Sequence, residues 1–459
     1  MHVFFISLFS FLPFIYCFYR PFLPQPFRIE TREIRQPLPA PTEPLFQELD
    51  GFYGLIGPDI NTTQVESLYD LFTGDGMIQG IFCHKGKMTF VKHFVRTEKL
   101  LFESIHGRFS KHVWMTPLYV FLNKIGVLPN VLGLANTAFL SLHTYEKLPP
   151  TGDRLFALFE RDLPYEIYPD QENQRMHTLT KIKIPSLSHF SGHSKYENGK
   201  IHTIDYNVLS NQVEYIQFDT QFRPLTRSVI KMNYMPLVHD FGVMDSRILL
   251  LDAPFEWTVA PKGDIPVKFH RQKPTHILLY DSFRKVLKRW IHPAPFYIFH
   301  YAAVKEVNGN IDIYAPVYDH IDFSSLDISG KYRNIRLKPD GRVVIKKNMA
   351  LERMNLDFPV TWGEYTILRS IENRKITGFV VCKGLVLLRR IRLPLGRYFC
   401  GEPAIIERGG QPYLLGFSYD DAGMGYVSIV GIFVNSYVEE SVGHPLTVGF
   451  HSIFTPRPL

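Results

Sequence analysis

A chain of 459 residues that is 45% hydrophobic and only 21% charged can bury a sizeable core, which excludes a largely disordered protein. Its formal charge of +7 is not gathered in one long Lys/Arg block, so a solvated sheet surface with weak attraction to anionic lipid is favoured, and no nucleic-acid partner is expected. The four cysteines, Cys17, Cys83, Cys382 and Cys400, form no CxxC pair, which argues against a zinc ribbon and indicates a reducing compartment.

The N-terminal segment, residues 1–20, is strongly apolar but does not have the pattern of a standard signal peptide. Its apolar run falls just short of the roughly 20 residues that a spanning helix needs, contains Pro13, and lacks a basic start or a cleavage site. Three interpretations stay open: a membrane anchor or uncleaved signal, an extension that lies on the protein, or a start codon placed too far upstream. Residues 21–45 are rich in proline and predict an extended linker.

Residues 46–459 are expected to form one domain built from strands. Short apolar runs such as Ile248-Leu249-Leu250-Leu251 alternate with turn signals such as Asn198-Gly199 and Pro339-Asp340-Gly341. Strand-length runs at this fairly regular spacing predict a large all-β sandwich, barrel or propeller. No internal repeat is visible in the sequence, so periodicity alone gives no blade count.

One apolar and aromatic segment, residues 112–132, interrupts the strand pattern. It contains a single lysine and two prolines. It is either a core helix followed by a loop, or an exposed patch whose Trp114, Tyr119 and Phe121 dip into a bilayer surface.

Four of the 18 histidines stand beside or within apolar strand-like runs: His193, His239, His300 and His451. A single histidine on a strand is more often a hydrogen-bonded structural residue than a ligand. The intervals of 46 (239−193), 61 (300−239) and 151 (451−300) residues match no short metal motif. Such spacing suits a closed array of sheets whose inner strands each deliver one residue to a common axis. Four neutral imidazoles suit Fe(II) and leave coordination positions open for dioxygen or substrate.

Three acids, Glu160, Asp357 and Glu402, stand in apolar strand-like settings where a bare carboxylate would be costly. Each one alone is equally well read as a surface acid at a strand end. Because an imidazole that binds a metal usually donates its second N–H to a carboxylate or carbonyl, we expect these acids to orient ligand histidines.

Short motifs along the chain also share a family order. In sequence they are Gly57-Pro58, Phe72-Thr73-Gly74-Asp75-Gly76-Met77, Leu134-Ala135-Asn136-Thr137-Ala138, Ala157-Leu158-Phe159-Glu160, and the segments at His193, His239, His300, Asp357, Glu402 and His451. At these residues, from about residue 50 to the C-terminus, the chain resembles the carotenoid cleavage oxygenase family of non-haem iron proteins.

The resemblance implies an all-β, seven-bladed β-propeller with short helical and apolar segments that cap the tunnel face. It implies Fe(2+) held by His193, His239, His300 and His451. It further implies that Glu160, Asp357 and Glu402 orient three of these ligands, and that Thr137 borders the vacant iron position.

Members of this family use O2 to split a double bond of an apolar polyene into two carbonyl products. A retinoid isomerase branch uses the same iron without net oxidation. Residues 112–132 fall where members carry the membrane-dipping segment at the tunnel mouth. The expected protein is therefore cytoplasmic and peripherally membrane-associated, and no obligate protein partner is inferred.

Departures from the family pattern bear on the substrate. Asp357 is one methylene shorter than the glutamate usual at that position, and Ser194 replaces a proline. Phe159 stands where stilbene-cleaving members place a lysine, so we expect a carotenoid or apocarotenoid. The alternatives are a polyene isomerase, a stilbene-type cleaving enzyme, or a carotenoid or lipid carrier that holds no iron.

Overall fold

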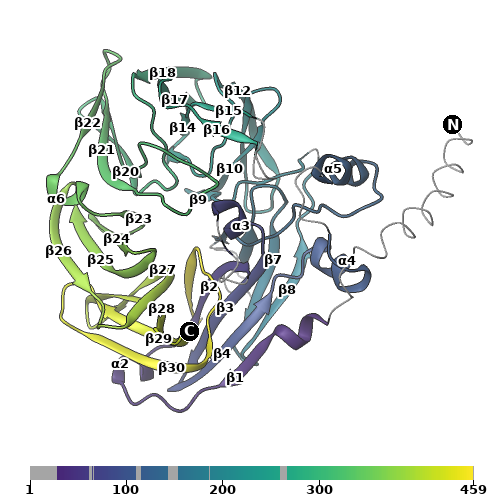
Figure 1. Cartoon of the computed structure of the whole chain (residues 1–459), viewed down its shortest axis with the longest axis vertical. Coiled ribbons are helices and arrows are strands. Elements are labelled where there is room, and N and C mark those ends of the chain that lie inside the picture. Colours follow the sequence, from purple (N-terminus) through teal and green to yellow (C-terminus); the bar gives the residue numbers. More distant parts are fainter. Residues whose placement is uncertain are drawn as a thin grey trace, which may run out of the picture.

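The computed structural model describes residues 28–60, 65, 67–109, 115–142, 154–185, 187–258 and 266–457. The apolar segment 1–20, and Trp114 within the predicted membrane segment, therefore lie outside the described residues. Strands dominate the described chain, and Figure 1 shows their sheets arranged around a central axis.

The described strands form seven antiparallel blades, which confirms the predicted all-β propeller. The first blade contains β1 (Ile34–Pro37), β2 (Gly51–Asp59), β3 (Asp75–His84), β4 (Lys87–Phe94) and β31 (Ser452–Pro456). The second contains β5 (Ala138–Leu142), β6 (Arg154–Leu158), β7 (Tyr165–Asp170) and β8 (Arg175–Lys181). The third contains β9 (Lys195–Glu197), β10 (Lys200–Asn207), β11 (Gln212–Phe218) and β12 (Pro224–Lys231).

The remaining blades follow the same antiparallel pattern. The fourth contains β13 (Gly242–Met244), β14 (Arg247–Asp252), β17 (Thr275–Asp281) and β18 (Val286–His292), with the hairpin β15 (Phe255–Trp257) and β16 (Val267–Phe269) inserted. The fifth contains β19 (Ala303–Val307), β20 (Asn310–Val317), β21 (Lys331–Leu337) and β22 (Val343–Lys346). The sixth contains β23 (Leu356–Trp362), β24 (Tyr365–Glu372), β25 (Lys375–Lys383) and β26 (Val386–Arg392).

The seventh blade contains β27 (Arg397–Arg408), β28 (Gln411–Asp420), β29 (Met424–Gly431) and β30 (Tyr437–Pro445), and a β25–β27 pair joins it to the sixth blade in one sheet. The two ends of the described chain then meet in the first blade. There the C-terminal strand β31 pairs with β2 and contacts both β27 and β5. A strand from the far end of the chain thus closes the ring and covers the edge that β2 would otherwise leave open.

Local sequence explains the individual strands. The run Ile248-Leu249-Leu250-Leu251 becomes the interior of β14 and is buried on both faces, because neighbouring blades cover both sides of each sheet. Asn198 and Gly199 have φ of 50° and 75° in the β9–β10 turn, the left-handed pair that a two-residue hairpin requires. The core consists of apolar clusters between adjacent blades.

The proline-rich stretch differs from the extended linker that we predicted over residues 21–45. In its described part, residues 28–45, a short 3-10 helix (Ile29–Arg32) precedes β1, which pairs with β4 at the outer edge of the first blade. Pro37 ends this strand, where a missing N–H is tolerated. The helix α2 (Pro44–Gln47) then buries Phe46. The folded body therefore includes residues that we assigned to the linker.

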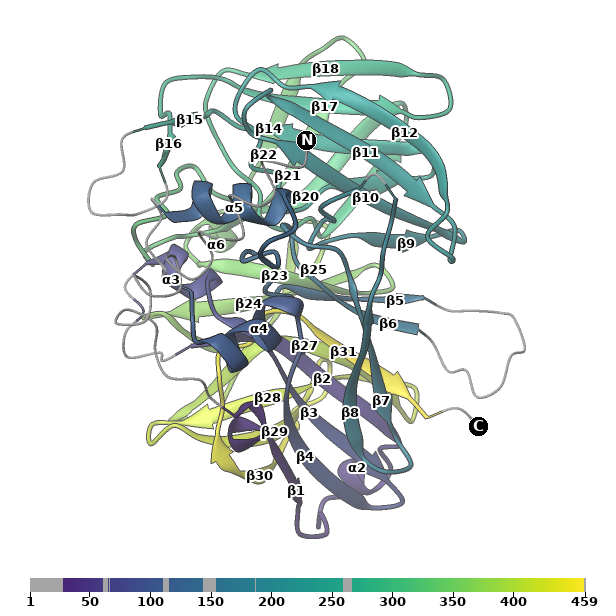
Figure 2. The same cartoon turned by 90° about the vertical axis from the view of Figure 1, so that its right-hand side faces the viewer.

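Short helices gather on one side of the ring. They are α3 (Leu68–Phe72), α4 (Glu98–His106), α5 (Thr116–Lys124) and α6 (Met349–Glu352). Figure 2 shows α3, α4 and α5 on the same side of the propeller. None of the helices in the described part of the chain is long and apolar enough to cross a membrane.

The predicted membrane segment 112–132 contains α5 and a following loop. One side of α5 packs on the protein: Tyr119 is buried, with its ring centroid 5.2 Å from that of Phe109. Tyr119 therefore does not face a bilayer, contrary to our expectation. Phe121 on the other side is 58% exposed. The segment thus combines the two interpretations, a packed helix and an exposed apolar surface.

Candidate metal centre and its cavity

Each of the seven blades places one polar residue in its innermost strand or just before it. In blade order, beginning with the second blade, these residues are Thr137, His193, His239, His300, Asp357, Glu402 and His451. They recur roughly every 50 residues, which is about one blade length. Sequence reasoning from the intervals between the histidines alone missed this spacing. Once Thr137, Asp357 and Glu402 are included, the seven residues recur at nearly regular intervals along the chain.

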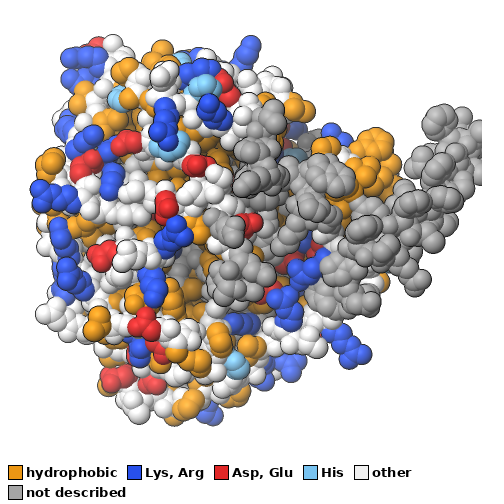
Figure 3. Space-filling model, in the orientation of Figure 1, with side chains coloured by type: hydrophobic (Ala, Val, Ile, Leu, Met, Phe, Trp, Pro, Cys, Tyr) orange, Lys and Arg blue, Asp and Glu red, His pale blue; other side chains and the backbone are white. Residues whose placement is uncertain are grey.

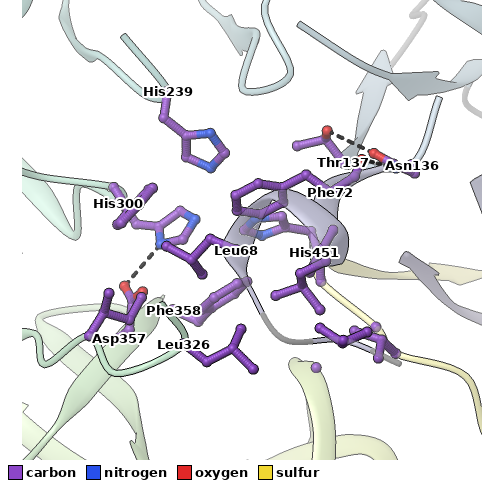
Figure 4. Close-up of a pocket in the computed structure, with 18 of the residues that line it drawn as sticks. Leu68, Phe72, Asn136, Thr137, His239, His300, Leu326, Asp357, Phe358 and His451 are labelled. Atoms are coloured by element: carbon purple, nitrogen blue, oxygen red, sulfur yellow. Dashed lines mark hydrogen bonds and ion pairs between the residues drawn. The ribbon is translucent and has the colours of Figure 1, made fainter. Parts of the chain in front are cut away.

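The four histidine rings converge at the propeller axis. The Nε2 atoms of His193 and His239 lie 3.0 Å apart. The ring centroid of His193 is 5.2 Å from that of His300 and 4.6 Å from that of His451. Nitrogens of His193, His300 and His451 all lie within 4.8 Å of one another. Figure 4 shows His239, His300 and His451 turned toward a common space.

The nitrogens at this centre fit a bound metal ion. His300 Nε2 is buried and has no hydrogen-bond partner among the described residues. Two nitrogens bound at right angles to one metal at about 2.1 Å would lie about 3.0 Å apart, as the Nε2 atoms of His193 and His239 do. Burial and the three neighbouring histidines lower the pKa of His193 well below its usual range, which keeps this ring neutral and its lone pair available.

All three predicted acids contact the outer nitrogen of a different histidine. His239 Nδ1 lies 2.5 Å from Glu160 Oε1, and His300 Nδ1 lies 2.9 Å from Asp357 Oδ1. His451 Nδ1 lies 3.2 Å from Glu402 Oε2. A carboxylate at Nδ1 fixes the tautomer that leaves Nε2 free for a metal. Among the four histidines, only His193 has no such carboxylate contact with a described residue.

Asp357 reaches His300 although its side chain is shorter than the glutamate usual in the family. The β23–β24 ladder shifts register between Asp357 and Val360, and Phe358 has a φ of 52°, so the backbone is displaced at this point. The Tyr318 hydroxyl donates to the second carboxylate oxygen over 2.5 Å. Burial would raise the pKa of Asp357, but the His300 and Tyr318 contacts lower this pKa to about 2.

The electrostatics differ among the histidines. Burial opposes protonation of His239, but the Glu160 carboxylate outweighs it and raises the pKa of His239. At His300 burial is the larger effect and lowers the pKa despite Asp357.

Thr137 lies at the edge of the histidine cluster, as Figure 4 shows. It is buried, and its hydroxyl lies 3.4 Å from Asn136 Oδ1. Asn136 Nδ2 in turn donates to the carbonyls of Phe72 and Gly74. Hydrogen bonds through Asn136 therefore connect Thr137, at the inner edge of the second blade, to the end of α3 and the segment that follows it.

A cavity of about 1360 Å³ leads to the centre and includes His239, His300 and His451 in its wall. Most of the wall is apolar, and Figure 4 shows Leu68, Phe72 and Leu326 around the histidine rings. Phe159, at the position of the stilbene-type lysine, also lines it. One charged wall residue, Arg369, was not anticipated, because it lies in an ordinary strand sequence without a motif.

Comparison with known proteins shows which protein family the chain resembles. The family model described as retinal pigment epithelial membrane protein matches residues 31–370. The chain is 25% identical over 315 residues to carotenoid 9,10(9',10')-cleavage dioxygenase 1 of Arabidopsis thaliana, a match that covers 62% of this chain and 54% of the relative. It is 24% identical over 323 residues to apocarotenoid-15,15'-oxygenase of Synechocystis, covering 62% and 60%. The chain thus spans little more than half the length of these relatives.

Solved structures give the same fold. A glutamate variant of Synechocystis apocarotenoid oxygenase matches with a TM-score of 0.74 at 17% identity and covers 95% of this chain and 100% of its own. The cobalt-substituted Synechocystis enzyme matches with a TM-score of 0.69 at 18% identity, covering 96% and 98%. The family match extends over well over half of the chain and agrees with the propeller seen here. The chain therefore belongs to the retinal pigment epithelial membrane protein family, the family of the carotenoid cleavage oxygenases.

Proposed function

We propose that this protein is a non-haem Fe(II) dioxygenase that cleaves a double bond of a carotenoid or apocarotenoid to carbonyl products. One observation carries the proposal: four imidazoles converge, three of them in the wall of a large apolar cavity, and carboxylates contact the outer nitrogens of three of the four. This arrangement would hold a divalent metal and would leave its cavity side open for small molecules.

The chain's own residues would divide the work. His193, His239, His300 and His451 would hold Fe(II), which would supply the binding and activation of dioxygen. Glu160, Asp357 and Glu402 would accept the Nδ1–H hydrogen bonds and so keep the Nε2 lone pairs directed at the metal. The Thr137 side chain would restrict one side of the metal, since it lies at the edge of the same space.

The apolar wall favours a polyene as substrate. Aromatic and aliphatic side chains dominate the cavity, and its volume of about 1360 Å³ exceeds that of common small-molecule sites. Phe159 offers no charged group to bind a phenol, unlike the lysine of stilbene-cleaving members. The names of the relatives, a carotenoid cleavage dioxygenase and an apocarotenoid oxygenase, support the same substrate class.

Labelled dioxygen tests the proposal and separates it from the isomerase alternative. Purified, iron-loaded full-length protein should consume O2 with an apocarotenoid and release two carbonyl products that contain oxygen from the labelled gas. A product that retains the complete polyene and takes its oxygen from water would overturn the dioxygenase assignment. Protein that takes up no iron under reducing, anaerobic conditions would instead favour a carrier.

We also propose that the chain docks on a cytoplasmic membrane surface through α4 and α5. Side chains on these helices are exposed and apolar, namely Leu101, Ile105, Leu118, Phe121 and Ile125. Figure 3 shows apolar side chains gathered over the position of α5. An exposed apolar patch next to basic residues such as Lys124 suits the interface of an anionic bilayer.

Phe121→Glu should reduce co-sedimentation with anionic liposomes several-fold, because it places a charge on the inserting surface. Phe283→Glu is the matched control, since Phe283 is 85% exposed on the β17–β18 turn, at the rim of the fourth blade. Equal liposome binding by both variants and the unmodified protein would remove α5 from the contact surface.

A further inference from the structure

Arg369 is a buried cation with no hydrogen-bond or ion-pair partner among the described residues. It lies in β24, opposite Asp357 in the ladder, and its side chain lines the cavity although the residue is only 6% exposed. Among the described residues its guanidinium makes no hydrogen bond and no ion pair, and Nε is fully buried without a partner. Buried arginines are almost always paired, so this one is available to bind something that enters the cavity.

Arg369 lies close to the candidate metal centre. Its guanidinium carbon is 3.3 Å from the ring centroid of Phe358. The same ring has its centroid 4.3 Å from that of His300 and 4.8 Å from that of His451. The cation is therefore within about 8 Å of the His300 ring. Phe358 keeps a left-handed φ of 52°, an energetically costly backbone conformation that positions its ring between these groups.

The nearby acids do not neutralise Arg369 by direct contact. The carboxylates of Asp357 and Glu402 already interact with His300 and His451, and neither lies within ion-pair distance of the guanidinium. Burial lowers the pKa of Arg369 to about 10, so the group stays protonated at neutral pH. The face of Phe358 offsets part of the charge by a cation–π contact but accepts no conventional hydrogen bonds.

A carboxylate is the group that completes this site. Its two oxygens match the fork of N–H donors on a guanidinium, and its charge compensates the buried cation. Two nearby wall residues are apolar: Ile371, in the same strand as Arg369, and Ile376, in the neighbouring strand β25.

Two other arginines line the cavity, and both have partners. Arg161 donates to the carbonyl of Tyr206 over 3.2 Å, with its guanidinium carbon 4.0 Å from the centroid of the Tyr206 ring. Arg374 is paired with Asp327 and is 61% exposed at its side chain. Among the described wall arginines, Arg369 is thus the one without a hydrogen-bond or ion-pair partner, in a wall that is mostly apolar.

We propose that Arg369 binds the carboxylate end of an acidic polyene, so that the substrate class of this enzyme includes apocarotenoid acids. This inference rests on the proposed function and narrows it: a hydrocarbon carotenoid would leave Arg369 unpaired, whereas an acid would pair it. A fatty acid offers the same carboxylate on a flexible saturated chain, and the experiment therefore separates the two sources.

Equilibrium binding to full-length, metal-free protein tests the proposal without requiring catalysis. Quenching of tryptophan fluorescence by the polyene would be titrated with all-trans retinoic acid and with its methyl ester, and palmitic acid would be measured by its displacement of bound retinoic acid. The unmodified protein should bind the acid at least about tenfold more tightly than the ester, the difference expected for a buried, charge-assisted bidentate contact. It should also bind retinoic acid more tightly than palmitic acid. Equal binding of acid and ester would overturn the proposal, and equal binding of palmitic acid would overturn its polyene part.

Three variants assign the preference to Arg369. Arg369→Met keeps the length of the side chain but removes the charge, so it should bind acid and ester equally, while ester affinity stays as in the unmodified protein. Arg369→Lys is the second variant in case loss of the charge disturbs folding; it lacks the planar fork and should show a reduced preference for the acid. Arg374→Gln is the matched control and should keep the full preference. Retention of the preference in Arg369→Met, or its loss in Arg374→Gln, would contradict the assignment.

The experiments distinguish failure of the carboxylate subsite from failure of the proposed dioxygenase function. If the acid preference depends on Arg369 but iron-loaded protein cleaves no polyene, the dioxygenase proposal fails and the carboxylate subsite stands. If neutral carotenoids are cleaved and no acid preference exists, the subsite fails and the dioxygenase proposal stands.

Discussion

At the scale of single residues, the candidate centre depends on which nitrogen of each histidine ring contacts a carboxylate. Carboxylates contact Nδ1 of His239, His300 and His451, so the Nε2 atoms are left for a metal. These histidines and acids could be predicted from the sequence, because each is a polar residue beside or within an apolar strand-like run, or lies in a family motif. Arg369 could not, because it lies in an ordinary strand sequence without a motif. The role of Phe358 could not, because it depends on a register shift that no local sequence pattern indicates.

Replacement of one candidate ligand tests the centre residue by residue. His300→Ala should lower iron content from about one atom per chain to a small fraction, because one of four imidazoles is lost. His202→Ala is the control, since His202 is buried and hydrogen-bonded to Tyr215 away from the centre. The check is iron measured by atomic emission after desalting. Full iron occupancy in His300→Ala would remove this ring from the ligand set.

The carboxylate at Asp357 has a separate expected effect. Asp357→Asn should weaken iron binding by about 10- to 100-fold while the protein still folds, because an amide cannot supply the charge that orients and polarises His300. Competition for Fe(II) with a chelator of known affinity measures the change. Asp205→Asn, which alters an acid near His189 on the third blade, should bind iron as the unmodified protein does.

At the scale of elements, the site depends on how the C-terminal segment packs against the first blade. Strand β31 and the residues before it deliver His451, and β2 provides the surface on which they lie. The sequence predicted strands here and placed the Gly57-Pro58 and His451 motifs at opposite ends of the chain. Their contact could not be predicted from local pattern alone, because the closure of the ring joins segments with no relation in sequence.

Gly57→Ala tests that contact. An added Cβ would lie 2.1 Å from the carbonyl oxygen of Val448 and 2.9 Å from Cα of Gly449, both backbone atoms that cannot rotate away. We expect a loss of about 1–3 kcal/mol in unfolding free energy and reduced iron content, since the strand that carries His451 must move. Gly309→Asn is the control, because a Cβ there meets open space and asparagine tolerates its φ of 74°. Chemical denaturation of both variants measures the difference, and equal stability would show that the closure adapts.

At the scale of the whole molecule, the centre links blades that are far apart in sequence. The candidate ligands come from the third, fourth, fifth and first blades, so one bound ion would connect the C-terminal segment of the described chain to its middle. The all-β class could be predicted from strand-length runs and turns, whereas the seven-bladed count came from the family resemblance. No sequence repeat revealed the blades because their residues differ, and only the positions of the inner polar residues recur.

This linkage predicts that the metal stabilises the fold. Removal of iron by a chelator should lower the unfolding temperature, and re-addition of Fe(II) should restore it. At a free metal concentration of 100 times Kd the expected stabilisation is about 2.7 kcal/mol. Differential scanning calorimetry of the same sample before and after chelation measures the shift, and the His300→Ala variant should show almost none. An unchanged transition in the unmodified protein would mean that the metal does not bind the native state preferentially.

X-ray absorption at the iron edge of the reconstituted protein tests the central claim most directly. The structure predicts one iron per chain, with four imidazole nitrogens at about 2.1 Å and the multiple-scattering pattern of histidine rings. A first shell dominated by sulfur or by carboxylate oxygen, or a fit that needs fewer imidazoles, would contradict the convergence of His193, His239, His300 and His451 on one metal.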